Sequence, residues 1–263
     1  MKKGLCGIIT LLLMLTAACF AGAESGQAMY YASRTGSRVA AVFAAADIQP
    51  WADEDGETDH LDSIWVYYTD GTFEQFAEMD DKVLLFSSGS YELPGNADFI
   101  SGNQDGEKEE IVIRREMKYA AGKGLADYQS EHTYELGTLG FTQLYAGENP
   151  ERQVKAIFYG IDKQPYTERD GDREMLDTWW IYYTDGSFEQ YAVVEDKVAP
   201  FSEGTYTLGE GSSFVYEKNG ENSDWITIQR TKKYQSGSLA PYESSHEYEL
   251  GTLGLVRISA IDE

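Results

Sequence analysis

The chain carries one long segment twice, and this duplication constrains its fold more than any other feature. Residues 39–146 realign with residues 154–260 at an offset of 115 positions. The segment Ile64–Phe76, IWVYYTDGTFEQF, returns as Trp179–Tyr191, WWIYYTDGSFEQY. Each copy has over a hundred residues, which is long enough for a hydrophobic core of its own. The sequence therefore predicts two similar domains in tandem.

The offset falls to 114 near the end of each copy, where Tyr134–Gly140 returns as Tyr248–Gly254. One residue has therefore been lost from the second copy, and the loop at 120–127 is its predicted place. The expected organisation is a signal peptide at 1–23 (or a lipoprotein signal at 1–18), a linker at 24–38, a first β-repeat domain at 39–146, a linker at 147–153 and a second β-repeat domain at 154–263.

The first residues have the pattern of an export signal. Lys2 and Lys3 precede an uncharged apolar run at 4–18, and Ala21–Ala23 is a small-residue cleavage site. The run is too short for a membrane-spanning helix of about 20 residues, and no later segment reaches that length without charges. We therefore expect an extracytoplasmic bacterial protein without a transmembrane span.

Lipidation of Cys19 is a competing interpretation of the same segment. The sequence Leu15–Cys19, LTAAC, resembles the lipobox of bacterial lipoproteins, although Thr16 stands where that pattern prefers leucine. Secretion and anchoring at the cell surface both stay open. The two cysteines, Cys6 and Cys19, lie in this leader. The expected mature domains therefore contain no disulfide, catalytic thiolate or cysteine-ligated metal.

The strong negative charge narrows the classes of partner. The formal net charge is −24, and the first repeat alone holds 22 acids against 6 bases. Such a field repels nucleic acid and anionic lipid, which bind to basic surfaces. It is compatible with cations, neutral sugars and basic proteins, and it also favours solubility outside the cell.

Short alternating segments and Asx-Gly pairs indicate an all-β fold without an amphipathic helix. We predict that each repeat is an antiparallel meander resembling a barrel, with a β-sandwich as the alternative. The closing strand at 141–145 can pair with the opening strand at 38–45 and so avoid a free edge. Asn219–Gly220 is predicted to be a turn.

The clearest element is a hairpin at the centre of each repeat. Asp70–Gly71 and Asp185–Gly186 are typical of a two-residue type I′ turn. Such a turn predicts that Tyr68 pairs with Phe73 and that Trp65 pairs with Phe76. In that register Phe73 shares a face with Ile64, Val66 and Tyr68, and both faces of the hairpin carry aromatic residues.

The second aromatic face has three interpretations. It packs under a loop or against the sister domain, it binds the apolar faces of sugar rings, or it faces a protein partner for which two copies raise avidity. In the sugar-binding interpretation, glutamate and glutamine contact the hydroxyls. The candidate ligand-binding residues are Trp65, Tyr67, Glu74, Gln75 and Phe76, with Trp180, Tyr182, Glu189, Gln190 and Tyr191 in the second copy.

The acidic loop at 53–62 resembles a calcium-binding loop only superficially. If Gly56 occupies the sixth position of an EF-hand, Trp51 is the first ligand and Asp62 the twelfth, so the motif fails. A turn with solvated acids is the preferred interpretation, and no metal is expected.

Matched polar residues leave a catalytic hypothesis open. A histidine and a carboxylate can perform acid–base chemistry where they meet in a cleft. Each repeat, however, has only one matched histidine, and the sequence has no nucleophile motif or phosphate loop. The matched pairs are His132 and His246, Arg115 and Arg230, Asp62 and Asp177, and Glu135 and Glu249.

These patterns predict an extracytoplasmic binding or interaction module for carbohydrate or protein, without a cofactor and without enzymatic activity. The alternative is a structural spacer or assembly protein at the cell surface that has no small ligand. A secreted glycosidase-like hydrolase is the third hypothesis, and it requires two carboxylates that face each other across a cleft.

Overall fold

The computed structural model describes residues 37–52, 55–95, 97–100, 109–147, 149–167, 171–215 and 224–261. The expected signal peptide, Cys19 and the Asn219–Gly220 turn lie outside these ranges. Within them, no helix has the length and apolar character needed to cross a membrane.

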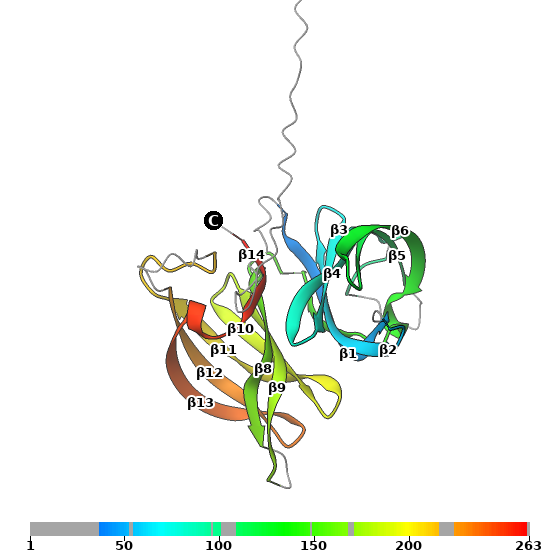
Figure 1. The fold of residues 1–263 in the computed structure, drawn as a ribbon. Coiled ribbons are helices and arrows are strands. Elements are labelled where there is room, and N and C mark those ends of the chain that lie inside the picture. The colour runs from blue at the N-terminus through cyan, green and yellow to red at the C-terminus, as the bar shows by residue number, and fades with distance from the viewer. Residues whose placement is uncertain are drawn as a thin grey trace, which may run out of the picture.

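The described part of the chain is built almost entirely from β-strands, seven in each repeat (Figure 1). The strands of the first repeat are β1 (Val39–Ala52), β2 (Thr58–Tyr68), β3 (Thr72–Met79), β4 (Lys82–Glu92), β5 (Glu110–Ala120), β6 (Gly124–Glu135) and β7 (Thr142–Ala146). Those of the second are β8 (Val154–Thr167), β9 (Arg173–Tyr183), β10 (Ser187–Val194), β11 (Lys197–Leu208), β12 (Trp225–Gln235), β13 (Ser238–Glu249) and β14 (Val256–Ala260). Short 3₁₀ turns, η1 (Leu136–Thr138) and η2 (Leu250–Thr252), precede the last strands.

Each repeat is a single antiparallel sheet in the predicted meander. The strand order is β6-β5-β4-β3-β2-β1-β7 in the first repeat and β13-β12-β11-β10-β9-β8-β14 in the second. The closing strand pairs with the opening strand in both, as predicted. The sheet curls around an interior, which Figure 1 shows most clearly for β4, β5 and β6. The prediction of a duplicated all-β domain is therefore confirmed.

The lost residue lies where the sequence predicted it. In the first repeat Ala120 pairs with Gly124 across three loop residues. In the second, Gln235 pairs with Ser238 across two, and these two, Ser236 and Gly237, have positive φ angles of 52° and 105°. The shorter loop thus has the signs of φ that a two-residue hairpin turn needs.

The predicted register of the central hairpin is wrong by one residue. Tyr67 pairs with Phe73, and Trp65 pairs with Gln75. The turn has three residues, because the Gly71 amide donates to the Tyr68 carbonyl at 3.1 Å and only Gly71 has a positive φ, of 81°. This is a type I turn followed by a glycine bulge.

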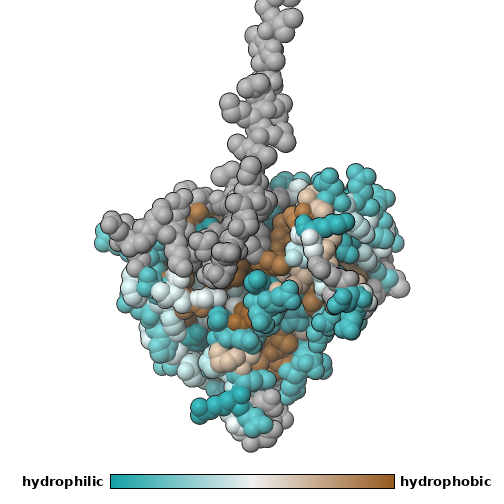
Figure 2. All heavy atoms as spheres, in the orientation of Figure 1, coloured by the Kyte–Doolittle hydropathy of each residue, from teal (hydrophilic) through white to brown (hydrophobic). Residues whose placement is uncertain are grey.

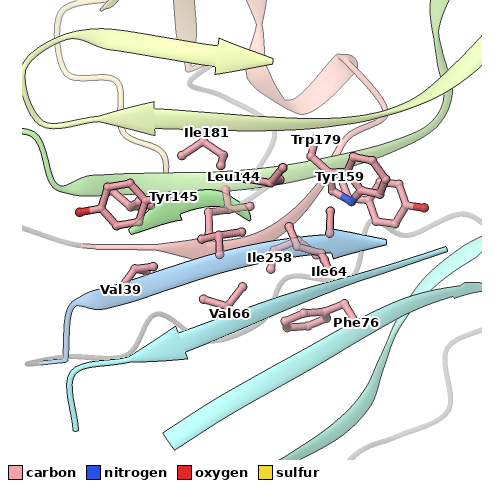
Figure 3. Close-up of a cluster of buried hydrophobic side chains, with 14 of the residues drawn as sticks. Val39, Ile64, Val66, Phe76, Leu144, Tyr145, Tyr159, Trp179, Ile181 and Ile258 are labelled. Carbon is pink, nitrogen blue, oxygen red and sulfur yellow. The ribbon is translucent and has the colours of Figure 1, made fainter. Parts of the chain in front are cut away.

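The shift in register exchanges Phe73 and Phe76 between the two faces, because side chains alternate along a strand. Phe73 joins Trp65 and Tyr67 in the interior of the curled sheet. Phe76 joins Ile64 on the outer face, where a second core lies between the repeats (Figure 3). One face of the hairpin therefore packs against the sister domain, but it is the face of Ile64 and Phe76, whereas Trp65 and Tyr67, for which that packing was an interpretation, lie inside their own sheet.

The contact between the repeats has approximate twofold symmetry. β1 lies against β11, and β4 lies against β8. Because β11 is the equivalent of β4 and β8 the equivalent of β1, the two contacts exchange roles between the copies. On the face shown in Figure 2 the described surface is largely hydrophilic, and hydrophobic residues show mainly between the repeats.

Candidate functional site

The ten candidate residues divide between two environments. Trp65, Tyr67 and Gln75 point into the first sheet's interior, and both aromatic side chains are only 3% exposed. Glu74 and Phe76 lie on the face toward the other repeat. The second repeat divides in the same way, with Trp180, Tyr182 and Gln190 inside and Glu189 and Tyr191 between the repeats. The expected exposed platform of tryptophan, tyrosine and carboxylate is therefore not formed.

The glutamates bind tyrosines between the repeats. The Tyr68 hydroxyl donates to Glu74 at 2.8 Å. Glu189 accepts from the hydroxyls of Tyr183 and Tyr191 at 2.8 and 2.9 Å, and from Arg152 at 2.5 Å. Burial, and after it the charge of Glu189, raises the pKa of the Tyr191 hydroxyl. These carboxylates bind tyrosines of their own repeat, and neither glutamate is among the described residues that line the two cavities reported below.

Each curled sheet contains a cavity, of about 350 Å³ in the first repeat and 360 Å³ in the second. Both volumes fall within the range of roughly 300–1,000 Å³ found for ligand pockets. The first cavity is lined by Ile48, Gln49, Pro50, Trp65, Tyr67, Phe86, Ile113, Arg115, Lys118, Tyr128, His132, Tyr134, Leu139 and Phe141. The second is lined by Lys163, Gln164, Pro165, Thr178, Trp180, Tyr182, Ile228, Arg230, Lys233, Tyr242, His246, Tyr248, Leu253 and Leu255.

The two linings, as far as the described residues form them, are equivalent at every position except Phe86 in the first and Thr178 in the second. Of the equivalent positions, only Ile48/Lys163 and Phe141/Leu255 carry different residues. The core between the repeats has diverged much further: among its residues from the first repeat, only Val39, Tyr68 and Val83 have an identical equivalent. The duplication has thus kept the cavities alike and let the contact change.

Aromatic side chains form one wall of each cavity, and the guanidinium group of an arginine lies over them. Trp65 stacks on Tyr67 with ring centroids 6.2 Å apart, and Trp180 stacks on Tyr182 at the same distance. The Arg115 guanidinium carbon lies 5.2 Å from the Trp65 ring centroid, and that of Arg230 lies 5.3 Å from Trp180. These separations are within the range of cation–π attraction.

A β-bulge turns a second cation into each cavity. Arg115 and Lys118 are an odd number of residues apart and would face opposite ways in a regular strand. The register of β5 shifts between Arg115 and Met117, so that both side chains line the cavity. In β12 the register shifts between Arg230 and Lys232, and Lys233 lines the second cavity with Arg230.

The lysines lie near the rim of each cavity. Lys118 Nζ is 5.5 Å from the ring centroid of Tyr128, and Lys233 Nζ is 5.6 Å from that of Tyr242. Both tyrosines are well exposed, at 40% and 37%. Burial lowers the pKa of the Lys233 ammonium group, and the neighbouring charge of Arg230 lowers it further.

Buried hydrogen bonds between side chains hold one glutamine in place in the lining of each cavity. Gln75 donates to the side-chain oxygen of Gln49 at 2.6 Å and accepts from Ser87 at 2.8 Å. In the second repeat Gln190 donates to Gln164 at 2.7 Å and accepts from Ser202 at 2.6 Å. Because their partners hold them, Gln49 and Gln164 present defined orientations at the cavity lining.

The structure brings together only part of the matched polar set. His132 and Arg115 line the first cavity, whereas Asp62 accepts from the backbone amide of Asp47 at 2.8 Å and is not among the lining residues. Glu135 pairs with Glu110 at the end of a ladder. Among the described lining residues neither cavity has a carboxylate beside its histidine, and no cluster of three His, Cys, Asp or Glu in the described ranges is suited to a metal ion.

Sequence reasoning missed Gln49, Lys118, Tyr128 and Tyr134. Their signal was available, since each is identical in the second copy as Gln164, Lys233, Tyr242 and Tyr248. The alternation of strands cannot place Lys118 inside, because only the bulge does so. Comparisons with protein-family models, curated proteins and solved structures gave no match.

Proposed function

We propose that this protein is an extracytoplasmic binding protein that holds one small organic ligand in each of its two cavities. The observation that carries this proposal is the retention of the same aromatic and polar lining in both copies, while the contact between them diverged. If these positions served only to pack a core, apolar residues would be favoured at them. Packing gives no reason to keep Arg115, Lys118 and His132 as well.

Binding fits this arrangement better than turnover does. A tryptophan–tyrosine wall stacks on a flat ring, such as an aromatic ring or the apolar face of a sugar, and fixed amides hydrogen-bond its polar groups. A glycosidase-like reaction needs two carboxylates, and the lining residues that the structure describes include none. Two equivalent sites in one chain also raise avidity for a ligand that repeats along a polymer.

Blocking the cavities one at a time tests this proposal. Leu139 and Leu253 are half-buried lining residues that follow η1 and η2. Tryptophan at these positions fills the cavity from its edge. For a ligand found in a thermal-shift screen of sugars and small aromatic molecules, isothermal titration should give two sites per chain, one in L139W or L253W, and none in the double variant.

The matched control is Met175→Trp, which adds the same side chain at an exposed position outside both cavities. It should leave two sites. Unchanged stoichiometry in the double variant would show that binding occurs elsewhere. No binding from the whole screen would favour the spacer alternative.

Export and anchoring belong to this proposal too, and they are supported by the apolar leader and by Cys19. The intact mass of the mature protein separates cleavage after Ala23 from a diacylglyceryl group on Cys19. A mass that retains the leader would contradict both.

A further inference from the structure

The described cavity linings carry positive charge in a strongly negative protein. The net charge of the chain is −24. The first cavity is nevertheless lined by Arg115, Lys118 and His132, without an aspartate or glutamate among its described lining residues. The second repeats this arrangement with Arg230, Lys233 and His246, and adds Lys163.

The cations next to these residues on the same strands point outward, and carboxylates pair with them. Arg114, next to Arg115, binds Glu92 at 3.1 Å and Glu131 at 2.6 Å on the outer face of the sheet. Lys232, next to Lys233, binds Glu203 at 2.7 Å. The outward cations are thus neutralised by carboxylates.

The inward cations have no such partner within the described part of the chain. Arg115 donates to the Tyr134 hydroxyl at 3.2 Å and lies over the Trp65 and Tyr134 rings. Lys118 and Lys233 each lie over two aromatic rings. No described carboxylate forms an ion pair with these three residues or with Arg230.

Partial burial of unpaired charge is unfavourable, and an anion would relieve it. Cations removed from water lose hydration that a hydroxyl or an aromatic face replaces only in part. The lowered pKa of Lys233 has the same origin, since burial and Arg230 both oppose its charge. The buried Trp65 Nε1 group also has no hydrogen-bond acceptor among the described residues.

We infer that each cavity binds a small organic oxyanion, whose carboxylate or equivalent group is held by Arg115 and Lys118, or by Arg230 and Lys233, and whose ring stacks on the tryptophan–tyrosine wall. This inference rests on the proposed function and specifies its ligand class. Arginine suits the role because its planar donors match a carboxylate. Lys163 adds a charge to the second cavity, which should therefore bind an anion more tightly than the first.

Ligand pairs that differ in one charged group test the inference. We would titrate the full mature protein with benzoate and benzamide, and with galacturonate and galactose, and follow the indole N–H signals of Trp65 and Trp180 by NMR. The anionic member of at least one pair should bind roughly tenfold or more tightly than the neutral member, as expected for a charge-assisted hydrogen bond. Added salt should reduce that preference.

The double variants R115Q/K118Q and R230Q/K233Q should remove the preference from one cavity each while the neutral member still binds. The matched controls R114Q and K232Q replace a cation on the outer face of the sheet. Both variants should still prefer the anionic member of the pair. Circular dichroism verifies that each variant is folded.

Two contrary outcomes are distinct. Equal binding of the charged and neutral members overturns the anion inference and leaves the proposed function standing. If no member of either pair shifts the indole signals at millimolar concentration, the cavities are not sites for such molecules, and both proposals are wrong.

Discussion

Gly89 in β4 and its equivalent Gly204 in β11 lie close to the backbone of the neighbouring strand. A Cβ atom on Gly89 would lie 2.0 Å from the Arg114 carbonyl oxygen, and one on Gly204 would lie 1.9 Å from that of Gln229. The register of β4 against β5 shifts at Gly89. Since Arg115 follows Arg114, this glycine lies beside the bulge that sets the cavity cations.

Gly89→Ala should therefore destabilise the protein by about 2–4 kcal/mol, the range typical of a severe backbone clash. Urea unfolding followed by tryptophan fluorescence measures the loss. Ser90→Ala is the control, because it changes a half-buried neighbour without adding atoms. A loss below about 0.5 kcal/mol in G89A would show that the strands separate without strain.

At the scale of strands and turns, the sequence predicted what depends on pattern and missed what depends on local geometry. The meander, the paired closing strand and the lost loop residue follow from alternation and from the internal repeat. The register of the central hairpin does not. A three-residue turn is closed by Asp70, whose carboxylate accepts from the amide and the hydroxyl of Thr72 at 3.0 and 2.6 Å.

The error in the hairpin register determined which residues were predicted to form the candidate site. Because the register was one residue out, Phe76 was grouped with Trp65, and the platform combined side chains that lie on opposite faces. The cavity also depends on the bulge beside Arg115, which alternation cannot reveal. The aromatic wall of Trp65 and Tyr67 was identified correctly as a pair, although it lies inside the sheet.

Two hairpin turns use acidic residues where glycine is favoured. Asp80 and Asp81, between β3 and β4, have φ angles of 52° and 57°, and Glu195 and Asp196 have angles of 51° and 58°. Left-handed backbone is unfavourable for side chains with a Cβ atom, and adjacent carboxylates repel each other. The turns are therefore local sites of strain.

Replacing Asp81 and Asp196 by glycine should relieve the strain and stabilise each hairpin by up to about 1 kcal/mol, less the added entropy of the unfolded chain. Differential scanning calorimetry should show a higher Tm for D81G/D196G. Asp172→Gly, in which the replaced residue has no positive φ, serves as the control and should not raise it. A lower Tm in D81G/D196G would mean that these acids make contacts worth more than the strain.

At the scale of the whole molecule, the stability of the protein should depend on pH, because carboxyl groups are buried where the two repeats meet. Glu78 accepts from the Tyr159 hydroxyl at 3.0 Å and shares a hydrogen bond with Asp177 of the other repeat. Burial, followed by that hydrogen bond and the charge of Asp177, raises the pKa of Glu78 above its ordinary value of 4.5. Burial also raises the pKa of Asp62 from 3.8 to about 6.

A carboxyl group whose pKa is higher in the folded state keeps a proton that the unfolded chain has released. The contribution of these two groups to the stability of the folded state is therefore fully present below about pH 4, and it is lost as pH rises through 6 and beyond. Urea midpoints should fall between pH 5 and pH 8.5. Glu78→Gln should reduce the fall, because glutamine donates a hydrogen bond without ionising, whereas the exposed control Glu243→Gln should not change it. Equal slopes in all three proteins would contradict the role of Glu78.

The near-twofold contact between the copies suggests an origin for the present chain. The arrangement of β1 against β11 and β4 against β8 is the one that two identical single-repeat subunits would form. In a single chain that carries both copies, the two halves of the contact do not need to be identical. The first copy has Ala44, Ile64 and Glu78 where the second has Tyr159, Trp179 and Val193. A dimer of first copies would leave voids and crowd acids together, and a dimer of second copies would have to fit twice the bulk. The two copies are therefore unlike where they meet and alike where they are hollow, so the chain is asymmetric at its centre and nearly symmetric in its two cavities.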